Sequence, residues 1–319
     1  MIDFENIQVP VYVITGFLDS GKTSFLNFTI SQEYFQIEET TLLLVCEEGE
    51  EVFGAQQMEQ YNTVIETIEN EEDFTLKTLR TLQKKHEPSR VILEYNPLWG
   101  VAKLEQMRLP KGWGIMQEIV VADASTFSIY MNNMKSLFVE MARNAEMVLF
   151  NRAAEDLPLA NFRRSIKVVN PGCDVQFMGL DGGPVDIFSD TLPYDLEKEP
   201  IEIEDIDYGI FFVDMQDNPG KYMGKQVRFK GQVIKSRNLS ADYFVPARSA
   251  MTCCADDIQF IGYVCKSKEA PRLKEGSWVE VTATIGQEYF EAAGREEPVF
   301  TASAVEPADP PAVELVYFN

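Results

Sequence analysis

Residues 16–24 bring together residue types whose order suits the binding of phosphate groups. The run from Gly16 to Thr23 reads GFLDSGKT, which fits the pattern G-x-x-x-x-G-K-[ST] of phosphate-binding loops. In such loops the glycine backbone turns successive N–H groups toward an anion, and the following helix N-terminus adds favourable partial charge. Lys22 is expected to reach the β- and γ-phosphates, and the Thr23 hydroxyl is expected to bind Mg²⁺. The predicted nucleotide contacts in this loop are Gly16, Asp19, Ser20, Gly21, Lys22, Thr23 and Ser24.

The elements around this loop must present it at the edge of a sheet. Residues 11–14 read as a short buried strand, and residues 24–28 read as the start of a helix. Further apolar runs alternate with helical patterns at 41–45, 91–93, 119–121, 147–150 and 166–169. This alternation predicts an α/β domain with a mainly parallel sheet flanked by helices. Ligands of such sheets bind at the carboxyl ends of the strands, which is where the loop lies.

Polar side chains follow several of these apolar runs. They are Glu47 and Glu48 after 41–45, Glu94 at the end of 91–93, Asp123 after 119–121, and Asn151 with Arg152 after 147–150. Any one of them alone is more often an ordinary loop residue, but their shared position beside a phosphate loop favours a role at the site. We predict that Glu94 and Asp123 help Thr23 to hold Mg²⁺, because carboxylate oxygens suit this ion.

The sequence pattern changes after about residue 190. Residues 195–207 (DLEKEPIEIEDID) carry seven acidic residues and read as an exposed connector. Beyond them, apolar and polar residues alternate with period two, as in Val279 to Ile285, which predicts a small all-β barrel or sandwich. We therefore predict a P-loop domain over residues 1–190, an acidic linker over 191–207 and a β-barrel domain over 208–319.

The charge balance excludes some classes of partner. The 319 residues include 51 acidic and 28 basic side chains, which gives a net charge of −23. A field of this sign repels nucleic acid and anionic lipid surfaces, so we expect no nucleic-acid partner. The N-terminal residues lack the pattern of a signal peptide, and no apolar stretch approaches the ~20 residues that span a bilayer. We expect a cytoplasmic protein that is not embedded in a membrane.

A second cluster of chemically active residues lies in the C-terminal part. Cys253 and Cys254 are adjacent, two aspartates follow directly, and Cys265 lies a strand later. Thiols beside carboxylates suit Zn²⁺, whereas packing as small apolar residues in the barrel is an equal alternative. The single histidine, His86, gives no basis for a Ser–His or Cys–His nucleophile.

Residues 9–180 resemble the CobW-type branch of P-loop GTPases, a metallochaperone branch. The strongest likeness lies in PVYVITGFLDSGKTSF (10–25). Weaker motifs follow in the family's order: Cys46-Glu47-Glu48-Gly49-Glu50, Glu94-Tyr95-Asn96-Pro97, Asp123-Ala124, Asn151-Arg152-Ala153-Ala154 and Val169-Asn170-Pro171. The resemblance implies slow Mg²⁺-dependent GTP hydrolysis, with Glu47 or Glu48 sensing the γ-phosphate and orienting water. It also implies that Asn151 contacts the base, and that the protein forms a homodimer.

Two departures from the family pattern affect what the resemblance implies. The family's CxCC metal motif, expected near residues 65–74, is absent from this sequence, which removes that route for zinc. The family's base-reading aspartate falls on Ala154, so either Glu155 takes over this role or base selectivity is relaxed. Arg152 keeps an aliphatic stem that can stack on the base. GTP is the expected nucleotide, with ATP as the alternative.

Residues 208–319 resemble an uncharacterised bacterial family encoded beside predicted permeases. The likeness rests on the pattern R-x-x-x-x-CC-AxD over residues 248–257, and it implies an oligonucleotide-binding-like barrel. Two functions follow. The first is a GTP-binding protein with slow hydrolysis that acts in metal homeostasis, mainly of zinc, or that regulates a permease or metalloprotein client. The alternative is a non-hydrolysing, nucleotide-responsive adaptor for a membrane permease.

Overall fold

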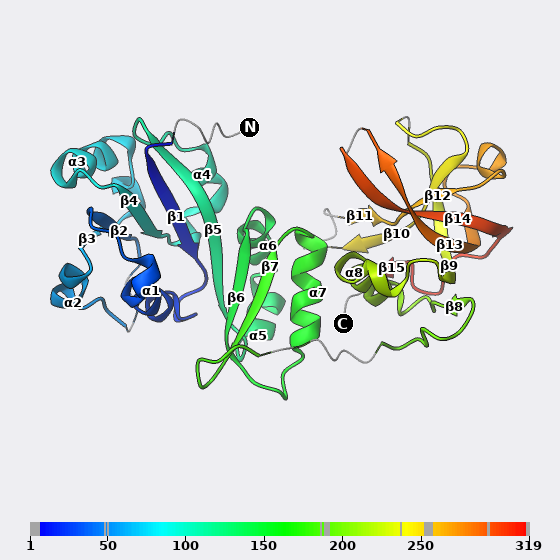
Figure 1. The fold of residues 1–319 in the computed structure, drawn as a ribbon, viewed down its shortest axis with the longest axis horizontal. Coiled ribbons are helices and arrows are strands. Elements are labelled where there is room, and N and C mark those ends of the chain that lie inside the picture. Colours follow the sequence, from blue (N-terminus) through cyan, green and yellow to red (C-terminus); the bar gives the residue numbers. More distant parts are fainter. Residues whose placement is uncertain are drawn as a thin grey trace. The chain divides into compact units, whose positions relative to one another are not determined.

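The computed structural model describes residues 7–47, 49, 51–185, 187, 192–236, 238–251, 258–291 and 294–316. The chain divides into two compact units, Met1–Ile187 and Phe188–Asn319. Each unit has its own sheet and its own buried apolar core (Figure 1).

The first unit is built on a sheet whose described strands all run parallel. The strands are β1 (Val9–Thr15), β2 (Thr41–Val45), β3 (Thr63–Thr67), β4 (Arg90–Glu94), β5 (Trp113–Asp123), β6 (Met147–Ala153) and β7 (Asp174–Gly179). Their order in the sheet is β3-β2-β4-β1-β5-β6-β7, and each neighbouring pair is parallel. β2 and β4 are buried along their full lengths, as expected for strands covered on both faces. The predicted parallel α/β fold is confirmed.

Helices cover both faces of this sheet (Figure 1). They are α1 (Lys22–Ser31), α2 (Ala55–Gln60), α3 (Leu76–His86), α4 (Val101–Gln106), α5 (Phe127–Asn133), α6 (Lys135–Arg143) and α7 (Leu159–Val169), with the short 3-10 helices η2 (Glu33–Phe35), η3 (Glu71–Asp73) and η4 (Pro97–Trp99). Side chains of α1 and α2 pack in the same apolar cluster as Ile14, and those of α3 and α4 pack in the cluster of Val13. Because Val13 and Ile14 are neighbours on β1, these clusters lie on opposite faces.

Two details of the first unit differ from the sequence predictions. The run 166–169 is the last turn of α7 and not a strand. Phe162 and Ile166, four residues apart, are both buried, which is helical spacing, and a run of four residues is too short to reveal this period. The edge strands β3 and β7 were not predicted, because their mixture of polar and apolar residues (TVIET and DVQFMG) shows no apolar run.

Five strands of the second unit close into a barrel. The elements of this unit are β8 (Ile201–Glu202), α8 (Tyr208–Asp217), η5 (Pro219–Lys221), β9 (Gln226–Ile234), β10 (Tyr243–Met251), β11 (Ile258–Ile261), β12 (Val264–Lys266), η6 (Ala270–Arg272), β13 (Trp278–Phe290), β14 (Arg295–Pro307) and β15 (Leu315–Val316). The ring runs β9-β10-β12-β14-β13 and back to β9. The β12–β14 contact is parallel and the other four are antiparallel. A five-stranded barrel of this kind is the form of the oligonucleotide-binding fold, so the predicted barrel is confirmed.

The acidic segment before α8 is not a free linker over its whole predicted length. β8 pairs with β9, and Ile201 and Ile203 are 0 % and 6 % exposed. The Asp205 carboxylate lies 3.0 Å from Nη1 of the buried Arg248. Isoleucines that alternate with acidic residues have the period of a strand, and the high charge of the segment concealed this in the sequence. The end of the predicted linker is therefore part of the second unit.

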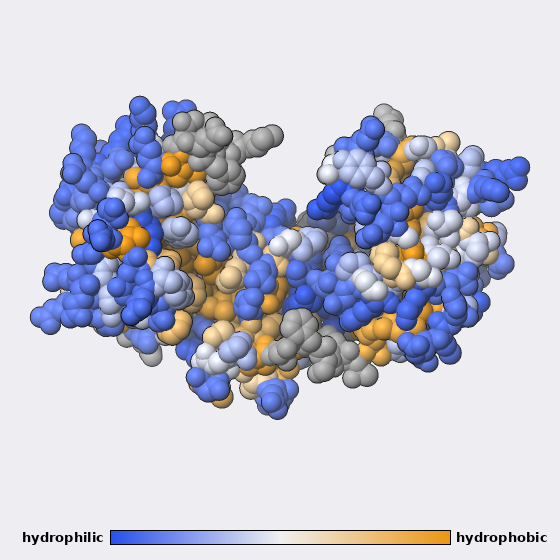
Figure 2. Space-filling model, in the orientation of Figure 1, coloured by the Kyte–Doolittle hydropathy of each residue, from blue (hydrophilic) through white to orange (hydrophobic). Residues whose placement is uncertain are grey.

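The visible surface of each unit is largely hydrophilic (Figure 2). Large exposed apolar side chains include Phe28 and Tyr34 in the first unit and Ile258 and Phe260 in the second. Among the described residues, no helix has both the length and the apolar character that a membrane span requires.

Candidate functional site

The loop between β1 and α1 adopts a conformation that depends on its glycines. Gly16 has φ 148° and Gly21 has φ 92°, and both values lie in the region that favours glycine. A Cβ atom on Gly16 would lie 2.1 Å from the Val121 carbonyl oxygen, and one on Gly21 would lie 2.4 Å from Asn151 Nδ2. The loop is thus held against the ends of β5 and β6, so that the start of α1 faces the carboxyl edge of the sheet.

Lys22, the first residue of α1, directs a buried ammonium group into this loop. Its Nζ atom donates hydrogen bonds of 2.9 Å to the carbonyl oxygens of Gly16 and Phe17. The same atom lies 2.6 Å from Glu47 Oε2, and the side chains of Lys22 and Glu47 are 3 % and 10 % exposed. The side-chain nitrogen is therefore buried and held in one position, with a single carboxylate as its ionic partner among the described residues.

Thr23 and Glu94 form the second feature of the site. The Thr23 hydroxyl donates a 3.2 Å hydrogen bond to Glu94 Oε1. Glu94, the last residue of β4, is 3 % exposed, and its Oε2 atom has no hydrogen-bond partner among the described residues. Burial raises the pKa of Glu94 to about 7, and the Glu47 and Glu51 carboxylates add to this, while Lys22 and Thr23 oppose it. A hydroxyl and a carboxylate with an unpartnered oxygen are hard donors that fit Mg²⁺.

A cavity of about 300 Å³ lies over these groups. Its lining residues are Leu18, Asp19, Gly21, Lys22, Thr23, Ser24, Glu47, Gly49, Glu51, Glu94 and Arg152. The described lining thus contains four carboxylates and two cations. Because a nucleotide triphosphate is itself strongly negative, this balance requires a bound cation to accompany it. The buried Ser20 hydroxyl oxygen in the loop also lacks a hydrogen-bond partner among the described residues.

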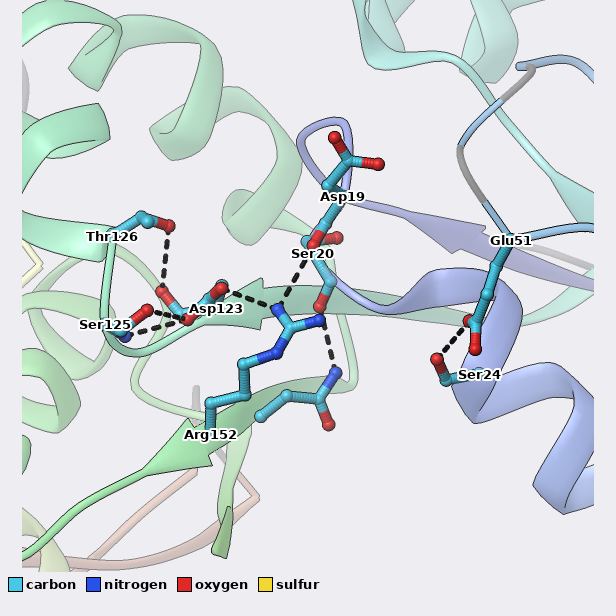
Figure 3. Close-up of polar contacts among 9 residues, drawn as sticks. Asp19, Ser20, Ser24, Glu51, Asp123, Ser125, Thr126 and Arg152 are labelled. Atoms are coloured by element: carbon cyan, nitrogen blue, oxygen red, sulfur yellow. Dashed lines mark hydrogen bonds and ion pairs between the residues drawn. The ribbon is translucent and has the colours of Figure 1, made fainter. Parts of the chain in front are cut away.

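The end of β6 holds two consecutive carbonyl groups of the loop. Asn151 Nδ2 donates to the Ser20 carbonyl oxygen at 2.9 Å, and Arg152 Nη1 donates to the Asp19 carbonyl oxygen at 3.2 Å (Figure 3). Arg152 Nη1 also lies 2.6 Å from Asp123 Oδ2. With these carbonyl groups bonded to β6, the arrangement of the loop is fixed before any ligand binds.

The placement of Asp123 does not fit the predicted role of Mg²⁺ ligand. Its carboxylate accepts hydrogen bonds from Arg152 and from the backbone N–H and hydroxyl of Ser125, at 2.8 and 2.6 Å (Figure 3). Thr23 instead contacts Glu94. The sequence indicated that Glu94 and Asp123 both lie at the ends of strands, but it did not show that Arg152 forms an ion pair with Asp123.

Three further acidic residues bear on this site, two that were predicted and one that was not. Glu155 is exposed in a turn after β6, and Glu48 lies outside the described residues. Glu51, which was not predicted, lines the cavity and accepts a hydrogen bond from the Ser24 hydroxyl (Figure 3). The acidic run after β2 was the only sign of Glu51 in the sequence, because its partner lies on α1.

The predicted zinc site in the second unit is only partly described. Cys253 and Cys254 lie outside the described residues. Cys265 on β12 is 0 % exposed, and its strand neighbours are Phe244 and Phe300. Burial raises the pKa of the Cys265 thiol to about 12, so in this state the thiol is protonated. Within the part of the chain that the structure describes, no three metal-binding side chains converge on one point.

Comparisons with known proteins give the following matches. Residues 188–318 match the family model of the DUF1980 C-terminal domain. The Zn(II)-bound YjiA GTPase from E. coli is 14 % identical with a TM-score of 0.42, over 92 % of this chain and 88 % of its own, and a Zn(II)-bound triple mutant of YjiA gives the same values. The hydrogenase maturation factor HypB from Archaeoglobus fulgidus is 17 % identical with a TM-score of 0.39, over 56 % of this chain and 85 % of its own.

No curated protein matches the chain. The family match coincides with the second compact unit, and it confirms the resemblance of the C-terminal residues to an uncharacterised family. Residues 188–318 thus match the model of the DUF1980 C-terminal domain, and the same chain carries a phosphate-binding loop in its first unit.

Proposed function

We propose that this chain binds GTP together with Mg²⁺ in the cavity over residues 16–24 and hydrolyses the GTP slowly. The observation that carries the proposal is the environment of Lys22. Its ammonium group is buried on the wall of a cavity, and its side-chain partner, Glu47, is one that an anion can replace. A lysine that is charged and directed before the ligand arrives loses little conformational freedom on binding.

The Glu47 carboxylate occupies the position beside Lys22 that we expect a phosphate group of the nucleotide to take. The carboxylate and a phosphate repel each other strongly in a site from which water is largely excluded. We therefore expect phosphate binding to separate Glu47 from Lys22. A released Glu47 would lie beside the entering phosphates, where it can orient the attacking water, as the family resemblance implies for Glu47 or Glu48.

The excess of carboxylates around the cavity sets a requirement for a divalent cation. Mg²⁺, when bound, supplies positive charge that neutralises the transferred phosphate group. The Thr23 hydroxyl and the unpartnered oxygen of Glu94 are the groups that we propose to hold it. Burial favours the protonated form of Glu94 before binding, so Glu94 must lose its proton to act as a ligand.

Competition between GTP and ATP for the site tests the proposed selectivity for the base. We propose that the base lies beside Arg152, with Glu155 as the acceptor that replaces the family's aspartate. GTP should displace a fluorescent GDP analogue at about tenfold lower concentration than ATP, and Glu155→Gln should remove the difference. Asp156→Asn is the matched control. Equal displacement by both nucleotides would contradict guanine selectivity, whereas displacement by neither would contradict the nucleotide site.

One observation favours the alternative function of a non-hydrolysing adaptor. Glu47 is engaged by Lys22 and is not free to orient water in this state. Phosphate release in the presence of Mg·GTP separates the alternatives. Several turnovers per chain that are lost in Glu47→Gln/Glu48→Gln support hydrolysis. Release of less than one phosphate per chain, with intact nucleotide binding, supports the adaptor.

A role in metal handling, or in regulating a permease, is a further part of the proposal. It rests on the CobW-type resemblance of residues 9–180 and on the permease-linked family that the C-terminal unit resembles. Zinc titration against a chromophoric chelator tests Cys253 and Cys254, with Cys265→Ser as the control for a buried thiol. We expect Cys253→Ser/Cys254→Ser to lose one bound zinc ion. Unchanged zinc binding in that variant would contradict a thiol site.

A further inference from the structure

Helix α3 carries a row of basic side chains in a strongly acidic chain. Lys77, Arg80 and Lys84, called the basic stripe from here on, are exposed. They line a shallow groove of about 450 Å³ together with Leu76 and Thr81. At 3.6 residues per turn the stripe falls on the side of α3 opposite to Leu79 and Leu82, which are buried against the sheet. In the view of Figure 2 the surface over α3 is mostly hydrophilic.

The basic stripe has no ionic partner among the described residues. Nearby cations differ in this respect. Lys85 Nζ lies 2.6 Å from Glu66 Oε1, and Lys103 is paired with Glu71. In a chain with 51 acidic and 28 basic residues, three adjacent cations that remain unpaired form a local positive field against the overall balance.

Helix stability does not account for the whole stripe. Lys84 lies in the last turn of α3, where a cation interacts favourably with the negative end of the helix dipole. Lys77 lies in the first turn, where the positive end of the dipole disfavours a cation. Binding of negative charge from outside accounts for all three positions.

We propose that the basic stripe is a docking surface for an extended acidic segment of a partner protein. The stripe residues are three and four positions apart, which corresponds to about 4.5 and 6 Å along the helix axis. Alternate residues of an extended chain are about 6.6 Å apart. Acidic residues at every second position of such a segment therefore come within about 2 Å of the axial spacing of the stripe at each step, a difference that long lysine and arginine side chains can bridge.

The chain already contains one example of this kind of contact. Glu202 of β8 lies 2.8 Å from Arg228, and Asp205 lies 3.0 Å from Arg248. Glu202 and Asp205 thus already have partners within the second unit, and the stripe is assigned to an acidic segment of another protein. The net charge of −23 repels long polyanions such as nucleic acid, which favours a short acidic peptide segment.

Fluorescence anisotropy with the full chain and a labelled peptide of alternating glutamate and threonine tests this surface at low salt. We expect saturable binding that Lys77→Glu/Arg80→Glu/Lys84→Glu weakens by at least about tenfold, because three surface ion pairs are lost. The matched control, Lys235→Glu/Lys268→Glu/Lys274→Glu, makes the same charge change on exposed lysines of the second unit. We expect it to weaken binding by less than about twofold.

A neutral variant, Lys77→Gln/Arg80→Gln/Lys84→Gln, keeps the test valid if the reversed charges disturb folding. It should melt like the wild type and still lose peptide binding. Three results would overturn the proposal: no saturable binding by the wild type at millimolar peptide, equal losses in the two triple variants, or tighter binding of single-stranded RNA than of the peptide at the stripe. None of these results bears on nucleotide binding.

Discussion

Lys22 in the first unit and Arg248 in the second are both buried cations, at 4 % and 1 % exposure, and their surroundings differ in kind. Lys22 is bonded to two backbone carbonyl groups and to Glu47, on the wall of a cavity of about 300 Å³. An anion that enters this cavity meets the ammonium group directly. Within the described part of the site, the ion pair with Glu47 is the contact that the anion must break.

Arg248 is enclosed by fixed parts of the barrel unit. Its guanidinium donates to Asp205 at 3.0 Å and to the Val313 carbonyl oxygen at 3.2 Å. The rings of Tyr208 and Trp278 each lie 5.5 Å from its Cζ atom. A buried positive charge therefore does not identify a binding site by itself. An exchangeable partner and an adjoining cavity distinguish the lysine from the arginine.

Removal of the lysine charge should have the largest effect. In Lys22→Ala the phosphate groups lose their buried cation, and we expect nucleotide affinity to fall by at least about a hundredfold, or about 3 kcal/mol. Equilibrium titration with a fluorescent GDP analogue measures this. Lys111→Ala, on the surface of the same unit, is the control. Retained nucleotide affinity in Lys22→Ala would contradict the assignment of Lys22 as the cation that binds the phosphate groups.

Removal of the arginine should instead destabilise the second unit. Arg248→Ala takes away the partner of Asp205 and leaves a space between two aromatic rings. We expect a loss of about 2 kcal/mol in the free energy of unfolding, which is less than for a fully buried ion pair because Asp205 is 36 % exposed. Urea unfolding followed by Trp278 fluorescence, in a Trp99→Phe/Trp113→Phe background, measures it.

The matched control for the arginine is Arg228→Ala, which removes a largely exposed ion pair with Glu202. It should leave the free energy of unfolding nearly unchanged, because exposed ion pairs contribute little to stability. Nucleotide affinity should be unchanged in both arginine variants. An Arg248→Ala chain that unfolds like the wild type but loses nucleotide binding would reverse the roles assigned to the two cations.

Neutralising the counter-ion of Lys22 should strengthen nucleotide binding. In Glu47→Gln the phosphate no longer competes with a carboxylate, and we expect affinity for Mg·GTP to rise by about tenfold. Turnover should fall in the same variant if Glu47 orients water. Glu69→Gln, which lies beyond the phosphate cavity, should change neither quantity. Weaker binding in Glu47→Gln would show that Glu47 is a ligand rather than a competitor.

The smallest expected effect is a dependence on pH that comes from Glu94. Its pKa is raised to about 7 by burial, and Mg²⁺ needs the ionised form, so Mg·GTP affinity should rise severalfold as pH increases from 6 to 8. Because the folded pKa exceeds the unfolded one, Glu94 should also lower stability as pH rises from about 4.5 to 7. Titrations across this range measure both trends, and Glu94→Gln should flatten them.

The sequence predicted the parts of the molecule whose signals are local. The loop around Lys22 and the buried runs of β1, β2 and β4 follow from neighbouring residues, and the structure brings Thr23 and Glu94 together at the expected edge. Contacts between residues that are far apart in the sequence could not be predicted from it. Arg152 contacts Asp123 from the neighbouring strand β6, and Asp205 contacts Arg248 of the barrel. Neither ion pair has a local sign in the sequence.

The most direct test of the account is calorimetric titration of Mg·GTP into the intact wild-type chain, repeated with excess EDTA. We predict one nucleotide bound per chain through the loop that carries Lys22, with binding lost when EDTA removes the cation that offsets the four carboxylates of the cavity. Absence of binding at millimolar Mg·GTP, or binding that EDTA leaves unchanged, would contradict the proposed site.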